Sequence, residues 1–421
     1  MTDSNSEQVL PASATQAPRL LGLDFTRGIA VLGILAANIV AFGQPMSAYM
    51  WPEAFLTPHG EASNWMWVVQ FILIDGKMRG LFTLLFGAGL VLFMEKAWEK
   101  GQTRWLQARR LFFLLIFGMI HYYLIWHGDI LILYAVVGFA AMACLRWKAK
   151  TQLIVGALGY VVGAIMFAVF MTFPYFVTET SFGDQGAMLE QRAELEKEVA
   201  NQMADDAAEA AINIDGSYGD IVAHRFNEHG WLPFINILMF SFETFPLMLL
   251  GMGLFRIGVF SGGIDPGTQR RWGWISLIFG TALTIPVALW ALGSGITYWG
   301  SIAAFMGFSF LPRVFMVLGL AMLLALWGPK ATGWLGQRFT AAGRMAFTNY
   351  LGTSVLMMLI FHPWAGGLWG ELNRPQLYIV VLVAWAIMLL WSKPWLARFR
   401  FGPLEWLWRC LTYGKLFPLK R

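Results

Sequence analysis

The amino-acid sequence predicts an all-α, polytopic transmembrane helix bundle. Of its 421 residues, 57% are hydrophobic and only 13% are charged, whereas a soluble domain carries about 25% charged residues. Apolar runs long enough to cross a bilayer as helices recur along the whole chain. The basic residues lie in short loops between these runs, where they act as topology signals. The net charge of +5 therefore indicates orientation in a membrane, and no nucleic-acid partner is expected.

About ten membrane crossings are expected, with both termini in the cytoplasm. The N-terminal tail, residues 1–18, is polar and is expected to be disordered. The first span lies in LLGLDFTRGIAVLGILAANIVAFGQP. The others are expected at about 78–95, twice in the hairpin 109–145, and at about 151–173, 231–256, 272–292, 301–327, 341–361 and 376–391. This arrangement places 23 of the 30 Lys and Arg residues on the inner side, as the positive-inside rule requires.

The polar segments divide the chain into two transmembrane halves, 19–173 and 231–421. The loop between them, 174–230, holds 12 of the 25 acidic residues and is expected outside the membrane. Its helix-forming composition over 185–214 predicts a short outer helix. The basic and aromatic tail 392–421 is expected to lie along the inner surface.

Residues 62–77 are apolar but end in a polar break, DGKMRG. A full crossing here would reverse the positive-inside pattern, so this stretch is expected to lie at the outer face or to dip part way into the membrane. Asp75, Lys77 and Arg79 would then lie near the outer boundary. Lys77 and Arg79 are candidates to bind a phosphate or carboxylate; the alternative is that they extend to the interface.

A candidate site lies in the hairpin RRLFFLLIFGMIHYYLIWHGDILILYAVVGF. His121 follows Arg109 by twelve residues, deep in the apolar run, and Asp129 begins the returning helix. Because a lipid-facing imidazole would lack partners, His121 is expected to face a polar cavity shared with Lys77 and Asp129. An imidazole is a suitable general base at neutral pH, and Asp129 would orient it. The alternative is a structural histidine in an internal polar network.

Asp24 and Arg27 lie three residues apart at the entrance to the first span and are expected to pair with each other or to contact a cytoplasmic ligand. Cys144 and Cys410 are both expected on the inner side, so no disulfide is predicted, and no metal-binding motif is present. Gly87 and Gly89 are interpreted as positions of close helix packing.

Five long motifs resemble the DUF418 family of bacterial inner-membrane proteins: LDFTRGIAVLGILAANI, DGKMRGLFTLLFGAG, GMIHYYLIWHGDILILYAVVGF, GRMAFTNYLGTSV and FRFGPLEWLWRCLTYGK. The resemblance covers nearly the whole chain and implies a multi-pass protein of the bacterial inner (plasma) membrane. The positions that match residues typical of the family are Asn38, Lys77, His121, Asp129, Arg344 and Asn349.

The N-terminal half is also similar to a wider superfamily of transmembrane acyltransferases, in which an LDxxRG opening leads into a span that ends near an Asn. A His in the following loop and an Asp entering the next span contribute to the site of that group. The matching residues here are Asp24, Arg27, Asn38, His59 and Asp75. The resemblance implies transfer of an acyl group from acyl-CoA, a co-substrate that is not tightly bound, to an outward-facing small-molecule or glycan acceptor.

On this hypothesis the catalytic candidates are His121, Asp129, Asn38, Asp75 and His59, and the substrate-binding candidates are Lys77, Arg79, Asp24, Arg27 and Asn349. Asn38 would donate a hydrogen bond to the developing oxyanion. A transporter or exporter of a small anionic or amphipathic molecule is the rival hypothesis, because the same polar residues would line its pathway. A non-catalytic membrane scaffold is a third. The lipid bilayer is the expected partner, and a homodimer is left open.

Overall fold

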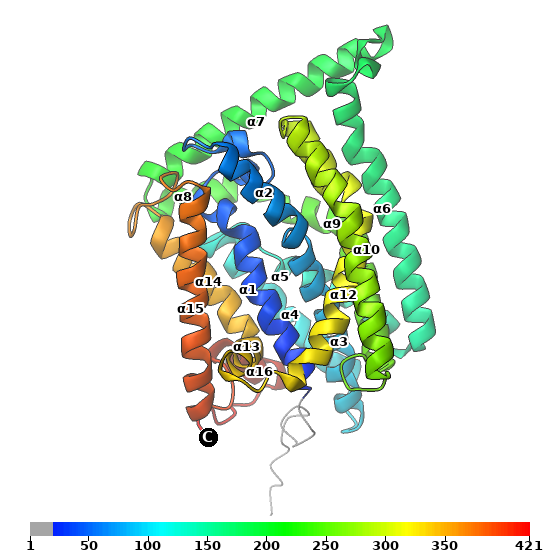
Figure 1. Cartoon of the computed structure of the whole chain (residues 1–421). Helices are drawn as coiled ribbons and strands as arrows, with labels where there is room; N and C mark the ends of the chain where they lie inside the picture. The colour runs from blue at the N-terminus through cyan, green and yellow to red at the C-terminus, as the bar shows by residue number, and fades with distance from the viewer. Residues whose placement is uncertain (1–19) are drawn as a thin grey trace, which may run out of the picture.

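The computed structural model describes residues 20–421, which form a bundle of helices (Figure 1). Within this range the only β-type pairing is an isolated bridge between Phe399 and Lys420. The all-α prediction is therefore confirmed. The tail predicted over residues 1–18 lies outside the described residues.

Among the described residues, eight helical segments are long and apolar enough to cross a membrane. They are α1 (Leu21–Gly43), α2 (Glu61–Leu73) with α3 (Lys77–Trp98), α4 (Arg104–Ile120) with the π-helical turn η3 (His121–Ile125), α6 (Ala149–Glu179), α9 (Leu232–Arg256), α10 (Pro266–Gly293), α12 (Phe310–Trp327) with η8 (Gly328–Lys330), and α15 (Arg374–Arg398). Two shorter apolar segments are α5 (Leu131–Ala141) with η4 (Met142–Arg146), and α14 (Ala346–Phe361). These segments coincide with the predicted spans; the number of crossings and the side of each terminus stay predictions.

The burial of these helices distinguishes a central helix from peripheral ones. In α1, 83% of the most apolar stretch is buried, compared with 22% in α10 and 28% in α6. The exposed face of α6 carries large apolar side chains such as Val162 and Phe170, which are 60% and 66% exposed. Apolar surface on this scale is stable in lipid and not in water. The chain is therefore an all-helical membrane protein.

Glycine contacts bring distant motifs of the sequence together. On α1, Gly28 packs against α13 (Trp334–Arg344), where a Cβ at Gly343 would overlap the Asp24 carbonyl oxygen. On α3, a Cβ at Gly87 would overlap the backbone of Met248 on α9. Close packing at Gly87 was predicted and is confirmed. The LDFTRG motif and the GRMAF motif thus share one interface.

The segment 61–98 is a broken helix, as its polar break predicted. The α2 helix ends part way along the bundle, and Gly76, with φ of 69°, starts α3. Glycine adopts this left-handed conformation without steric cost. A Cβ at this position would in addition overlap the Arg313 guanidinium. Asp75 and Lys77 are 2% and 1% exposed, so they are buried inside the bundle; their depth in the membrane stays a prediction.

Two helices cover one end of the bundle, which we call the α7 end. The α7 helix (Leu189–Asp215) crosses this end to reach α8 (Tyr218–Asn227) (Figure 1). The helix predicted over 185–214 is confirmed; with 27 residues it is about 40 Å long, longer than expected. Short turns complete this region: η1 (Met46–Tyr49), η2 (Pro52–Ala54), η5 (Ser181–Asp184) and η6 (Gly186–Met188).

The opposite end, which we call the α16 end, holds the start of α1, α13 and the C-terminal helix α16 (Pro403–Tyr413) (Figure 1). The α16 helix packs against α4 and α14, and Trp408 Nε1 donates to the Arg110 carbonyl at 2.9 Å. The predicted span 301–327 begins with α11 (Tyr298–Ile302) and the π-helical turn η7 (Ala303–Phe308) before α12. The chain after α15 thus packs against this end of the bundle; that this end is the inner surface stays a prediction.

Candidate functional site

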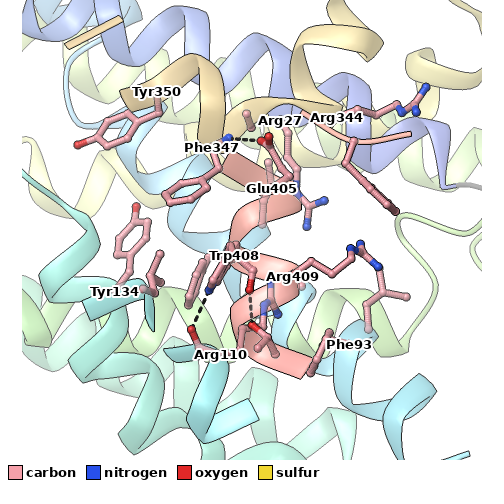
Figure 2. Close-up of a pocket in the computed structure, with 18 of the residues that line it drawn as sticks. Arg27, Phe93, Arg110, Tyr134, Arg344, Phe347, Tyr350, Glu405, Trp408 and Arg409 are labelled. Carbon is pink, nitrogen blue, oxygen red and sulfur yellow. Dashed lines mark hydrogen bonds between the residues drawn. The ribbon is translucent and has the colours of Figure 1, made fainter. Parts of the chain in front are cut away.

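A cavity of about 320 Å³ lies at the α16 end (Figure 2). Its walls come from α1, α3, α4, α5, α13, α14 and α16. Five basic side chains line it: Arg27, Lys96, Arg110, Arg344 and Arg409. Glu405 is the one acidic residue of the lining in the described part of the chain. A cavity with this excess of positive charge attracts anionic ligands, and arginine suits phosphate and carboxylate geometry.

The arginines are held in place by neighbouring side chains. Arg27 Nη1 lies 3.7 Å from Asp24 Oδ1, so the predicted pairing of these residues is confirmed. The Arg110 guanidinium lies over the Trp408 ring at 4.5 Å, which fixes its plane. Its Nη1 is buried and makes no hydrogen bond. Arg110 therefore presents a pre-positioned donor.

Glu405 fixes α16 against the start of α14. Its carboxylate accepts the backbone N–H groups of Phe347 and Thr348 at 2.8 and 3.0 Å, and it also accepts the Thr348 hydroxyl. A carboxylate at a helix N-terminus is favoured by the helix dipole. Burial raises the pKa of Glu405, and these hydrogen bonds oppose that shift. Glu405 is one carboxylate among five basic side chains, so the lining keeps an excess of positive charge.

Two tyrosines form the side of the cavity opposite Arg344 and Arg409 (Figure 2). The Tyr134 hydroxyl lies 2.6 Å from the hydroxyl of Thr83. The Tyr350 ring centroid lies 5.2 Å from that of His121. The tyrosines thus separate the basic cavity from polar groups deeper in the bundle.

His121 and Asp129 form a buried pair behind Tyr350. His121 Nδ1 lies 2.7 Å from Asp129 Oδ1, and the other carboxylate oxygen accepts the Ile132 N–H at 2.7 Å. His121 starts a π-helical turn, a local structure that is frequent at functional sites. Its side chain is 0% exposed, and within residues 20–421 its Nε2 makes no hydrogen bond. An ionised Asp129 would hold the proton on Nδ1 and leave a lone pair on Nε2.

The interior position of His121 and its contact with Asp129 were predicted and are confirmed, whereas Lys77 lies elsewhere. Lys77 Nζ donates to the Phe71 carbonyl at the break between α2 and α3. Asp75 lies at the same break and accepts from Gln70 at 3.0 Å. The predicted grouping of Lys77 with His121 is therefore wrong. Each belongs to a separate set of hydrogen bonds.

Arg79 belongs to an ion-pair cluster that ties α3, α9 and α12 together. Glu243 pairs with both Arg79 and Arg313, and its Oε1 accepts from Arg313 Nη1 at 2.9 Å. This arrangement pairs Arg79 within the protein, although one carboxylate serves two guanidinium groups. Arg79 is thus part of an internal polar network and does not extend to the interface, which was the alternative given for it above.

Three further candidates lie apart from the cavity. Asn349 donates to Ala342 and Ser392 and accepts from Trp391, all at 3.0–3.1 Å, so it joins α13, α14 and α15. Asn38 is half-buried on α1, and His59 is half-buried in the loop before α2. Neither lines the basic cavity. Their proposed roles stay predictions.

Sequence reasoning did not select Tyr134, Tyr350, Glu405 or Arg409. A signal existed for Glu405 and Arg409, which lie four residues apart in the amphipathic tail and share one helix face. A tyrosine within an apolar run carries a weaker signal, because it is also an ordinary packing residue.

An all-helical bundle with bilayer-length helices and buried charged groups defines a polytopic membrane protein. The family model "Protein of unknown function (DUF418)" matches residues 254–415. The chain is 30% identical to the uncharacterized protein YeiB of Escherichia coli (strain K12) over 412 residues, which are 95% of this chain and 98% of YeiB. It is 31% identical to the uncharacterized protein YxaH of Bacillus subtilis (strain 168) over 414 residues, 95% of each chain. The chain belongs to the DUF418 family.

A more distant relative, the uncharacterized 39.9 kDa protein in the amylase 3' region of Bacillus acidopullulyticus, is 25% identical over 407 residues, which are 95% of this chain and 96% of that protein. No solved structure matches the chain. The region matched by the family model includes α13, α14 and α16, which supply the C-terminal half of the basic cavity.

Proposed function

We propose that the protein is a membrane acyltransferase whose basic cavity binds an acyl-CoA donor. The observation that carries the proposal is the position of this cavity, which ends at Tyr350 directly against the buried His121–Asp129 pair. The acceptor would be a small molecule or a glycan. The α16 end would face the cytoplasm of a bacterial cell, because most loops rich in Lys and Arg end there.

The cavity suits a ligand with phosphate groups and an apolar arm. Arginines bind phosphates through paired N–H groups, and five basic residues line this cavity. Its other lining residues are largely aromatic and aliphatic, among them Phe82, Leu85 and Phe86. A volume of about 320 Å³ lies within the range of small-molecule sites.

The chemistry would run through the free nitrogen of His121. His121 Nε2 takes the proton from an acceptor hydroxyl or amine as its oxygen or nitrogen bonds to the thioester carbonyl carbon. The carbon–sulfur bond then breaks, and the thiolate takes the proton back from the imidazolium. The products are an ester or amide and a free thiol. Because Tyr350 lies between His121 and the cavity, its ring must move for the reaction to occur, as gating groups do in many enzymes.

The direct test is the binding of radiolabelled acetyl-CoA to the full chain purified in detergent. Arg110→Gln is expected to weaken binding at least tenfold, because it removes a buried donor to phosphate. Arg271→Gln is the matched control, since Arg271 is exposed and outside the cavity, and it should bind normally. Pantetheine, which lacks the phosphates, should not compete. Unchanged affinity in a folded Arg110→Gln variant would overturn the proposed donor site.

A transporter of an amphipathic anion is the second candidate, and the broken helix at Gly76 favours it. Broken helices with buried polar groups are a feature of transporter sites. Reconstituted vesicles separate the two functions. Release of free thiol from acetyl-CoA, lost in His121→Gln, would support transfer. Recovery of intact acetyl-CoA inside the vesicles, without thiol release, would support transport.

A further inference from the structure

A second cavity lies at the α7 end, and it shares no lining residue with the basic cavity. It is small, about 20 Å³, which is room for one water-sized group. Its polar lining residues are His127, Glu209, Asn213, Arg225, Ser354 and His362. They come from the turn after η3, from α7, from α8, from α14 and from the residue after α14, so that distant parts of the chain meet here.

Arg225 is the unusual residue of this cavity. It is 4% exposed, and its Nη1 makes no hydrogen bond to any described residue. Within residues 20–421 no carboxylate pairs with its guanidinium. Buried charges in proteins are paired or bind an ion, because an unpaired buried charge is costly. The guanidinium therefore needs an anionic partner.

His362 supplies a second buried nitrogen that could bind an anion, beside Arg225. It is 7% exposed, and its Nδ1 has no hydrogen-bond partner in the part of the chain that the structure describes. Burial, and then the Arg225 charge, lower the pKa of His362 to about 4, so its ring is neutral near pH 7 and can donate one N–H. His127 is also buried next to this site, and burial and Arg225 lower its pKa as well.

Glu209 does not supply the missing charge. Its Oε1 lies 3.9 Å from His127 Nε2. Burial, and then the nearby Asp206, raise the pKa of Glu209 to about 7, so at neutral pH the carboxyl is only partly ionised. The positive charge of Arg225 thus remains in excess.

We infer that the α7-end cavity binds one small monovalent anion between Arg225 Nη1 and His362 Nδ1. The anion would be a free halide ion or the terminal carboxylate of a ligand that enters from the α7 end. The volume admits a halide or the oxygens of a carboxylate, but no large group. This inference is independent of the proposed acyl transfer, because the site uses none of the residues of the basic cavity.

The test measures the melting temperature of the full chain in detergent as sodium chloride, bromide or acetate replaces sodium methanesulfonate at constant ionic strength. The sulfonate group is too large for the cavity and serves as the reference. A saturable rise with chloride and bromide supports a free halide. A saturable rise with acetate alone identifies the carboxylate.

Variants assign the effect to the cavity. Arg225→Gln is expected to weaken the anion dependence at least tenfold, and His362→Ala to weaken it to a smaller extent. Arg192→Gln is the control, because Arg192 lies exposed on α7 with its own ion pairs, and it should keep the full effect. If Arg225→Gln does not fold, His362→Ala still decides the question. The inference is overturned if no anion gives a saturable rise, or if both folded variants respond like the original protein.

Discussion

The change Asp129→Asn separates catalysis from structure at the His121–Asp129 pair. Asparagine is close in shape to aspartate, and its remaining oxygen can still accept the Ile132 N–H, now bound at 2.7 Å. Its amide NH₂ would face His121 Nδ1, which lies 2.7 Å from the carboxylate. Two donors cannot bond to each other, so the imidazole proton would move from Nδ1 to Nε2. His121 would then have no free lone pair where the acceptor's proton is to be taken.

Asp129→Asn is expected to lower the stability of the protein slightly and the rate of acyl transfer greatly. A hydrogen bond to a charged group contributes about 1.5–3 kcal/mol, and a neutral one about 0.5–1.5 kcal/mol. Replacing the hydrogen bond to the charged carboxylate with one to a neutral amide should therefore cost about 1 kcal/mol of stability. Loss of a general base with the correct tautomer should slow acyl transfer by about 10²–10⁴. By contrast, Asp129→Ala also leaves the buried Ile132 N–H without a partner and should cost about 1–3 kcal/mol more.

The assay combines thermal melting with thiol release from acetyl-CoA, using the full chain in lipid nanodiscs and a polar extract of bacterial envelopes as the source of acceptor. Asp184→Asn is the control, because Asp184 is an exposed residue of the α7 end, and it should leave thiol release unchanged. Asp129→Asn should melt within a few degrees of the original protein and lose nearly all thiol release. The catalytic argument is refuted if the folded variant releases thiol at the original rate.

Three further variants test the fold. Gly76→Ala should cost at least about 2 kcal/mol, because it combines a left-handed conformation with overlap on Arg313; an unchanged melting temperature would contradict this. Glu405→Ala should cost about 2–4 kcal/mol by freeing two backbone N–H groups at the start of α14, and Glu405→Gln should restore part of it. Glu209→Gln tests pH dependence. Folding raises the pKa of Glu209 from 4.5 to about 7, so ionised Glu209 destabilises the folded original protein increasingly between pH 4.5 and 7, and fully above pH 7. Glu209→Gln removes this cost, so the stability of the variant relative to the original protein should be up to about 3 kcal/mol greater at pH 8 than at pH 4. An equal stability difference at the two pH values would exclude the shift.

The helices were predictable from the sequence because apolar length is a local property. The first span was expected in the stretch that forms α1, and the polar DGKMRG motif marked the break at Gly76. The pairing of His121 with Asp129 was also accessible, because only a short turn separates the two residues. Each of these features depends on residues close together in the chain.

The basic cavity was not predictable, because it depends on contacts between distant segments. Arg27, Arg110 and Arg409 come from α1, α4 and α16, and no periodicity within one helix indicates that they share a cavity. The error over Lys77 has a similar origin. A depth in the membrane can be estimated from the distance along a helix, but the direction in which a side chain points around the bundle depends on which helices surround it.

The position of His121 between the two cavities bears on the choice between transfer and transport. The centroid of its ring lies 5.2 Å from the ring centroid of Tyr350, which lines the basic cavity. It lies 6.3 Å from the ring centroid of Trp126, which lines the α7-end cavity. Trp126 is also stacked on Phe42 at 3.9 Å, so two packed aromatic groups separate His121 from the α7 end. A transported molecule would have to displace both Tyr350 and Trp126 in turn. In an acyltransferase each ring needs to move only far enough for the thioester carbonyl and the acceptor to reach His121. Acyl transfer therefore requires a smaller rearrangement of the tightly packed core than transport does.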